Sequence, residues 1–381
     1  SAYASSPEVK NVQYLLNQIG FNAGKEDGLY GNTTKKALVD FYASQGKIFD
    51  GSADQNEISD LILENSKFMP TKNKITFANF YYTSKIQSCQ AMGVRSFKDS
   101  YNIKKVEGLI GYDWPTDHDQ NSNSRDVIHK NITQPIKFLL QATHNAISEN
   151  DVASIDIATK LLVRIAEADT LYDSIGYIAV KQKPRCYANG DYRSKCWYHE
   201  YEFARGVFSN FMIAALWLQE QLTPHEFELV DRYINKMYEK FLRPIEFKEQ
   251  EQGLYQMANG GLSILIYASW MNDKDLAAEE IKFRFKELNR IIFSDGYIDN
   301  NSFRGVRSQW YHSYGLDIAL GYVYIADLWG AETPETLHYK LVNSGKIANL
   351  AITDWQKFKS RKFTGPNRNA LKEKEHAIKH T

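Results

Sequence analysis

The chain has 381 residues, of which 43% are hydrophobic and 24% are charged, so it can form more than one minimal globular domain. Lysine plus arginine equals aspartate plus glutamate at 46 each, so the overall charge gives no reason to expect a nucleic-acid partner. The sequence lacks an apolar run of the roughly 20 residues that a membrane helix needs, so membrane insertion is not expected.

The first 66 residues have the pattern of a small three-helix domain. Apolar residues recur at helical spacing over 9–16, and a turn-rich segment follows at 24–31. A polar residue after that turn, Asn32 or Thr33, can cap a second helix, and a third helix follows the Asp-Gly turn at 50–51.

Two sequence patterns in this segment point to a known family. They are V-x-x-V-Q-x-L-L-x-x-x-G-F from Val9 and D-G-x-Y-G-x-x-T-x-x-A-L-x-x-F from Asp27, and together they resemble the peptidoglycan-binding-like domain. The resemblance implies a three-helix domain over 1–66 with cell-wall glycan as a partner. A module that packs or targets without binding glycan is the alternative. Residues 67–76 are the expected linker.

From residue 77 onward the pattern is helical, with little of the alternation that strands require. The expected helices cover 134–147, 152–168, 201–221, 224–241, 261–271, 275–292, 310–329 and 334–358. Successive antiparallel helices joined by short connections predict an all-α fold, with an α/α toroid over 77–381. Such a helical barrel leaves a groove at one end for an extended polymer.

The segment around Arg304, Arg307 and Tyr311 carries the most specific chemistry. The three side chains stand at offsets 0, 3 and 7, which share one face of a helix. Guanidinium groups can neutralise a carboxylate and can stabilise a nearby phenolate as a base. This combination suits removal of a proton beside a carboxylate.

This segment resembles part of the alginate lyase superfamily. In that family an Asn-bearing helix precedes a D-G-x-(I/L)-x-x-x-x-x-R-G-x-R-x-x-x-Y-H-x-Y-x-L segment by about fifty residues. In this chain the second element begins at Asp295, and Asn259 precedes Tyr311 by 311 − 259 = 52 positions. The family commonly has Asn-Asn-His at the first element, but Gly260 stands where the histidine would be.

The resemblance implies a polysaccharide lyase that cleaves a β-1,4-linked uronate polymer, such as alginate, polymannuronate or glucuronan, by β-elimination. Tyr311 would be the acid and the base in the family's scheme, Asn259 and Arg304 would neutralise the carboxylate, and His199 would replace the missing histidine. Further substrate contacts are expected from Arg307, His312, Gln256, Tyr198 and Trp310. The reaction requires neither a metal nor a cofactor.

Each assignment has a structural alternative. Tyr311 can be a core aromatic, Arg307 an ion-pair partner, His199 a buried histidine and Asn259 a helix cap. His312 is turned about 100° from Tyr311 around a helix, which places it behind the site or in the core.

Two other functions remain open. A glycoside hydrolase would use paired carboxylates, and the candidates are Asp113, Glu200, Glu202 and Asp299. A glycan-binding or cell-wall scaffold protein would keep the fold without turnover.

Three other features bear on the protein's environment. Cys186 and Cys196 flank a turn-rich loop that can close a disulfide, which would indicate a periplasmic or secreted protein. The oxygen-rich stretch 113–123 is spaced like a calcium loop, but it lacks the central glycine and the closing glutamate, so a solvated loop is expected. Basic residues gather from Lys357 to the C-terminus, where a solvated tail is expected.

Overall fold

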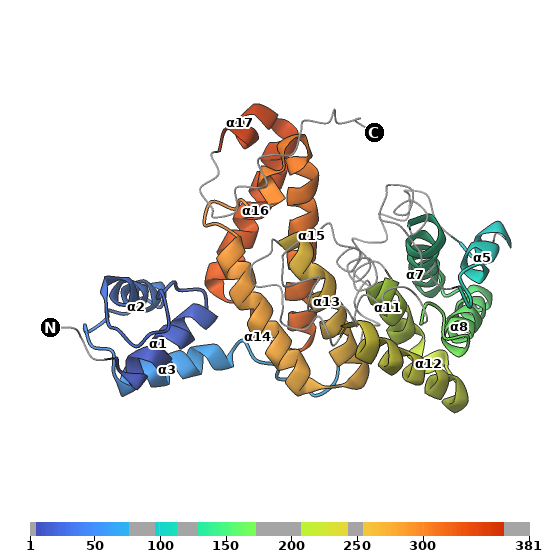
Figure 1. Cartoon of the computed structure of the whole chain (residues 1–381), viewed down its shortest axis with the longest axis horizontal. Coiled ribbons are helices and arrows are strands. Elements are labelled where there is room, and N and C mark those ends of the chain that lie inside the picture. The colour runs from blue at the N-terminus through green and yellow to red at the C-terminus, as the bar shows by residue number, and fades with distance from the viewer. Residues whose placement is uncertain are drawn as a thin grey trace. The chain divides into compact units, whose positions relative to one another are not determined.

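A computed structural model describes residues 5–75, 96–98, 100–112, 129–172, 207–242, 254–299 and 301–361 (Figure 1). These residues are mainly helical and include no strand; one isolated antiparallel bridge joins Ile292 and Ile298. The all-α prediction is therefore confirmed for this part of the chain. None of its helices combines the length and the apolar character needed to cross a membrane.

The chain divides into two compact units. The first contains residues 1–73, 249–258 and 274–381, and the second contains residues 74–248 and 259–273. Helix α13, Leu254–Met271, contributes residues to both units.

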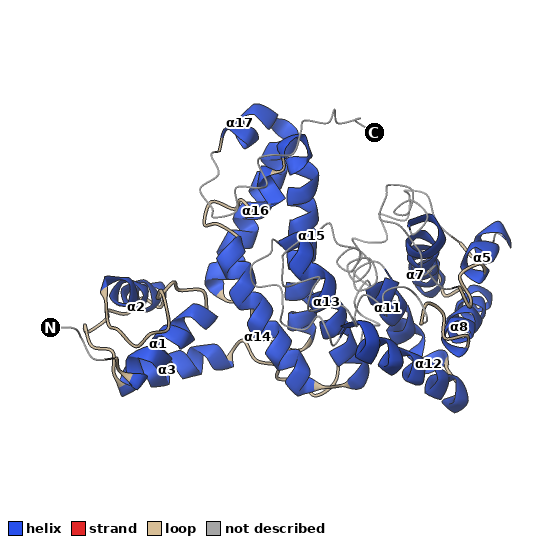
Figure 2. Ribbon diagram, viewed as in Figure 1, coloured by secondary structure: helices blue, strands red, loops and turns tan. Residues whose placement is uncertain are grey.

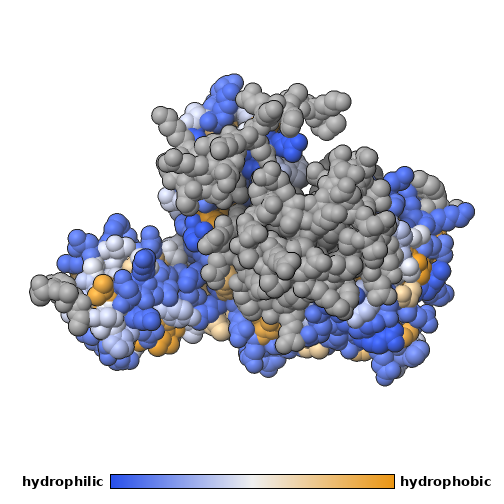
Figure 3. Space-filling view, viewed as in Figure 1, coloured by the Kyte–Doolittle hydropathy of each residue, from blue (hydrophilic) through white to orange (hydrophobic). Residues whose placement is uncertain are grey.

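The N-terminal part of the first unit is a three-helix domain, as predicted. Helices α1 (Pro7–Gln18), α2 (Asn32–Ser44) and α3 (Gln55–Ser66) enclose a core that includes Val12, Leu16, Leu38, Phe41 and Leu61. Gly31 occupies the N-cap of α2, in place of the expected Asn32 or Thr33 cap. In Figure 3 the visible face of this domain is mainly hydrophilic, as expected when most apolar side chains lie in the core.

The remainder of the first unit is built from long helices that pack side by side. They are α14 (Lys274–Ile291), α15 (Ser308–Leu328), α16 (Glu335–Thr353) and the short α17 (Trp355–Ser360). Two 3-10 turns, Asn301–Phe303 and Gly305–Arg307, lead into α15. Helix α16 packs against both α14 and α15 (Figure 1).

The N-terminal domain is docked on these helices. The Thr336 hydroxyl donates a hydrogen bond to the Ile19 carbonyl at 2.9 Å, and Lys286 pairs with Glu26 at 3.2 Å. The segment after α3 is also held, because the backbone N–H groups of Thr71 and Lys72 both donate to the Trp329 carbonyl. The domain and helices α14–α16 therefore form one packed body.

The described residues of the second unit are also mainly helical (Figure 2). Its helices are α5 (Ser100–Glu107), α7 (Gln134–Ser148), α8 (Val152–Glu167), α11 (Ser209–Leu218) and α12 (Pro224–Met237), with shorter turns at His129–Thr133, Gln219–Gln221 and Tyr238–Leu242. Helix α7 packs on α8 and α11, and α8 packs on α12.

Four expected helices, 134–147, 152–168, 275–292 and 310–329, lie within two residues of their predicted bounds. Residues 201–206 of the expected helix 201–221 lie outside the described residues, and α11 and a 3-10 turn cover 209–221. The expected helix 334–358 differs in kind. That single expected helix is two helices in the structure. The backbone of Asp354 leaves the helical region at φ −148° and ψ 79°, and its carboxylate accepts a hydrogen bond from the Lys357 N–H, which caps α17. Helix α13 also begins earlier than expected, at Leu254.

Candidate functional site

The segment before α15 is not one continuous helix. Arg304 has φ −98° and ψ 38°, and Gly305 has φ 60°. The helical backbone geometry is therefore interrupted between the two 3-10 turns. Helix α15 begins only at Ser308. The prediction that Arg304, Arg307 and Tyr311 lie on one face of a single helix is therefore wrong, because a left-handed glycine separates Arg304 from the helix.

The break nevertheless brings Arg304 to Tyr311. The Arg304 guanidinium carbon lies 4.3 Å from the centroid of the Tyr311 ring, which is a cation–π contact. The Tyr311 side chain is buried, and the Asn301 side-chain amide donates to the Tyr311 carbonyl at 2.8 Å. Arg304 and Tyr311, the cation and the phenol of the expected site, are therefore in contact, with the guanidinium over the face of the ring.

Trp310 and Tyr314 form the exposed side of the same region. Trp310 is 53% exposed. Its ring stacks on that of Tyr314 with centroids 5.3 Å apart and planes 6° apart, and it meets the Tyr311 ring edge-on at 4.8 Å. Arg307 is exposed and occupies the N-cap position of α15. Tyr314 belongs to the motif shared with the alginate lyase superfamily, but no role was predicted for it. Its i, i+4 spacing from Trp310 on a helix would have predicted that the two rings stack.

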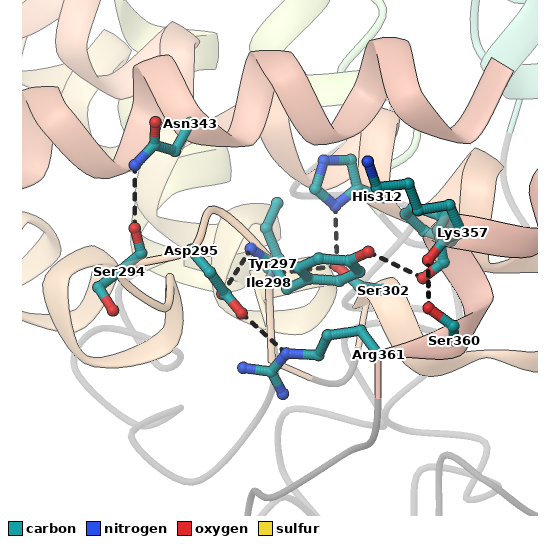
Figure 4. Close-up of polar contacts among 11 residues, drawn as sticks. Ser294, Asp295, Tyr297, Ile298, Ser302, His312, Asn343, Lys357, Ser360 and Arg361 are labelled. Atoms are coloured by element: carbon teal, nitrogen blue, oxygen red, sulfur yellow. Dashed lines mark hydrogen bonds and ion pairs between the residues drawn. The ribbon is translucent and has the colours of Figure 1, made fainter. Parts of the chain in front are cut away.

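His312 has the contacts of a core residue. It is fully buried, and its Nε2 lies 3.0 Å from the Ser344 carbonyl. Its Nδ1 lies 2.8 Å from the Ser302 hydroxyl (Figure 4). The Ser302 oxygen accepts the Ile298 N–H at 2.7 Å, so its own proton is directed to Nδ1. Burial lowers the pKa of His312, and the neutral ring with its proton on Nε2 satisfies every partner. The structural alternative for His312 is therefore favoured over a substrate contact.

Arg361 is anchored where a solvated tail was expected to begin. Its guanidinium pairs with Asp295 at 2.9 Å and lies over the rings of Phe293, Tyr297 and Phe303, at 4.8, 5.4 and 5.4 Å (Figure 4). Burial raises the pKa of Tyr297, whose hydroxyl donates to the Phe358 carbonyl at 2.8 Å. These contacts hold α17 against the segment that leads to α15, and nothing in the local sequence around Arg361 signals them.

Several expected site residues lie outside the described residues. They are His199, Tyr198, Cys186, Cys196, Asp113, Glu200 and Glu202, together with the stretch 113–123 and the basic residues after Arg361. Asn259 and Gln256 belong to α13, but only their backbone is described. Within the described ranges no group of three or more His, Cys, Asp or Glu side chains could hold a metal ion.

A second candidate site lies in the N-terminal domain, where two turns meet. Gln13 is buried, and its Nε2 lies within 3.1–3.2 Å of Asp27, Leu29 and Thr34, while its Oε1 accepts the Gly28 N–H at 2.8 Å. These bonds fix the Asp-Gly turn against α1 and α2. Gly28 has φ +77°, and a Cβ there would come within 2.7 Å of the Ser6 carbonyl, so the turn requires glycine.

The second turn is held to the first through a single hydroxyl. The Tyr30 hydroxyl donates to the Gly51 carbonyl at 3.2 Å, and burial raises the pKa of Tyr30. Beyond this contact, Ile48 in the 46–54 turn is 96% exposed. The two turns therefore form one edge of the domain that presents both polar and apolar groups.

Comparison with known proteins identifies this domain. Residues 5–59 match the family model described as a putative peptidoglycan binding domain. The chain matches no curated protein and no solved structure. The class of the N-terminal domain is thus shown, and the alginate lyase resemblance of the later segment stays a prediction.

Proposed function

We propose that the protein binds cell-wall glycan through residues 5–59. The match of these residues to the peptidoglycan-binding domain carries the proposal. The structure supports it, because the domain has a closed core of its own and its two turns are fixed by Gln13 and Tyr30. A fixed loop edge loses little conformational entropy when it binds an extended sugar chain.

Calorimetric titration with soluble peptidoglycan fragments tests this proposal. Saturable heat with disaccharide-peptide fragments, and none with a cello-oligosaccharide of equal length, is the expected result. Equal heats for both sugars, or no heat for either, would remove the proposal. The same titration distinguishes a glycan-binding domain from a module that only packs against α14–α16.

A second proposed function belongs to the helical region after residue 76. This region is proposed to be a polysaccharide lyase with an α/α toroid arrangement, acting on a β-1,4-linked uronate polymer. The contact between Arg304 and Tyr311 favours it, because it places a fixed positive charge against the phenol that the sequence motif marks as catalytic. Asn259 and His199 stay in the proposal as expected partners from the sequence.

The proposed reaction is a β-elimination. Tyr311, with His199 as the other candidate base, removes the C5 proton of a uronate, and Arg304 and Asn259 neutralise the adjacent carboxylate as charge develops on it. The electron pair forms the C4–C5 double bond and the C4–O bond breaks. The leaving O4 takes a proton from Tyr311. A periplasmic or extracellular location would bring such an enzyme to both the polymer and the cell wall.

Absorbance of the unsaturated product in the near ultraviolet tests the lyase proposal. Alginate, polymannuronate and glucuronan are incubated with the wild type and with Tyr311→Phe, which keeps the ring that Arg304 contacts. The expected result is a rise in absorbance with at least one polymer. The rate of this rise should be at least 100-fold lower in the variant, which is in the range for loss of a general acid–base group. Absence of this rise with all three polymers contradicts the proposal, and new reducing ends without absorbance would identify a hydrolase instead.

A further inference from the structure

We propose that Trp310 and Tyr314 form a stacking platform for one acidic pyranose ring, with Arg307 as the partner of its carboxylate. This subsite deepens the proposed lyase function and rests on it for the choice of polymer. It is a binding site, so it can be tested without turnover.

The first argument is the exposure of a large aromatic ring. Trp310 is 53% exposed, whereas Trp270 is 3% exposed and Trp329 is fully buried. A tryptophan that leaves about half its surface in water gives up about half of the stabilisation that full burial would provide. Single exposed apolar residues are common, so exposure alone does not make a site.

The second argument is that the exposed ring is held in one orientation. Trp310 stacks on Tyr314 with planes 6° apart, and the Tyr311 ring meets it at 83°. Tyr311 is itself buried beneath the Arg304 guanidinium at 4.3 Å. Each ring is thus supported by the next. A platform that is already ordered loses little side-chain entropy when a flat ligand stacks on it.

The third argument is charge. Arg307 lies three residues before Trp310, is exposed, and stands at the N-terminal end of α15, while Arg304 lies on the neighbouring ring. Along α15 the first carboxylate after these residues is Asp317, about two turns further on. An exposed aromatic ring, with an exposed arginine three residues before it and a second guanidinium over the adjoining ring, suits a ligand with a flat apolar face and a carboxylate at its edge.

A uronate in its pyranose form has both properties. The C–H groups on one face of the ring contact the indole, and the carboxylate in the ring plane is left to accept two parallel hydrogen bonds from a guanidinium. A neutral hexose offers the same face without the charge. The platform therefore predicts a preference for acidic over neutral sugars.

Calorimetric titration of the full chain tests the subsite, with Tyr311→Phe as the parent protein so that no substrate is consumed. The probes are tetramannuronate, tetraglucuronate and the neutral mannotetraose. Trp310→Ala is compared with Trp310→Phe and with Leu320→Ala, a matched control because Leu320 is a 47% exposed apolar residue on the same helix. Arg307→Gln tests the charge.

The parent is expected to bind at least one acidic tetrasaccharide at least tenfold more tightly than mannotetraose. Trp310→Ala should weaken that binding tenfold or more, as for an aromatic anchor, while Trp310→Phe and Leu320→Ala stay within threefold. Arg307→Gln should reduce the ratio of the affinity for the acidic tetrasaccharide to the affinity for mannotetraose. An unchanged dissociation constant in Trp310→Ala, equal binding of neutral and acidic sugars, or no binding of either acidic probe would overturn the proposal. Binding as expected, with no unsaturated product formed by the wild type from any of the three polymers, would retain the subsite and remove the lyase function.

Discussion

Buried polar side chains organise both candidate sites at the scale of single residues. Gln13 fixes the Asp-Gly turn of the N-terminal domain, and His312 joins the segment before α15 to α16 through Ser302 and Ser344. Leaving such a buried group without a partner costs about 1–3 kcal/mol, so each residue specifies its local structure strongly. Neither role can be read from the local sequence, because the partners lie 10 to 32 positions away.

His312 is expected to make stability depend on pH. Burial lowers its pKa from the ordinary value of 6.5, so the folded protein resists protonation of this ring. Above about pH 6.5 the ring is neutral in both states and contributes no pH dependence. Below that value the unfolded chain takes up a proton that the folded chain excludes. Stability is therefore lost as pH falls, by up to about 1.4 kcal/mol per pH unit.

Urea unfolding of the wild type and of His312→Gln measures this contribution. Between about pH 7.5 and pH 5.5 the free energy of unfolding of the wild type should fall more steeply than that of the variant, because glutamine does not titrate. The variant differs from the wild type in this one titratable group. Parallel curves would show that His312 takes up its proton as easily folded as unfolded.

At the scale of elements, helix boundaries were predicted well where a local capping sequence marks the helix end. Thr223 and Glu226 form a capping box at the start of α12, and the expected helix began at the same residue, Pro224. Prediction failed where a backbone feature depends on tertiary contacts. The break at Gly305 has no cap signal, and it is fixed by the bonds of Asn301 and Ser302 to residues ten positions away on α15.

The capping box of α12 gives a stability prediction. Thr223→Ala removes the hydroxyl that accepts the Glu226 N–H at 3.3 Å, and the expected loss is about 1 kcal/mol in the free energy of unfolding. Glu228→Ala is the matched control, because Glu228 is exposed on the same helix, and its effect should stay within about 0.5 kcal/mol. Equal effects of both changes on urea unfolding would show that the cap is not important.

At the scale of the whole molecule, the N-terminal domain behaves as part of the first unit. Gly20, at the end of α1, has φ +90°, and a Cβ added there would lie 2.6 Å from the Thr336 hydroxyl oxygen and would also meet the Asn289 side chain. Any larger residue would force these side chains to shift and would strain the backbone at this φ. The glycine pattern of this domain was visible in the sequence, but its role in docking on α14 and α16 required the structure.

A comparison of two glycine variants tests this docking. Gly51 has φ +101° with no neighbour within 4 Å of an added Cβ, so Gly51→Ala measures backbone strain alone, on the order of 1 kcal/mol. Gly20→Ala adds the clash with α14 and α16 and should destabilise the first unit by at least another 1 kcal/mol, as overpacking does. Equal losses in urea unfolding would mean that the domain is not held against these helices.

The two candidate sites differ in how far the sequence specified them. The N-terminal domain was predictable because its helix spacing and glycine turns are local patterns, and the family match agrees with them. For the candidate site at the start of α15, the sequence singled out Arg304, Tyr311 and Trp310, but it did not predict how these side chains are arranged. The guanidinium lies over the ring although the helical geometry is interrupted at Gly305, and a helical wheel does not contain such an interruption.

Co-sedimentation with purified peptidoglycan sacculi tests most directly the central claim, that the protein binds cell-wall glycan. The full chain should pellet with sacculi in a saturable manner, soluble disaccharide-peptide fragments should release it, and insoluble cellulose should not retain it. A protein that stays in the supernatant with sacculi, or that pellets equally with cellulose, would contradict the claim.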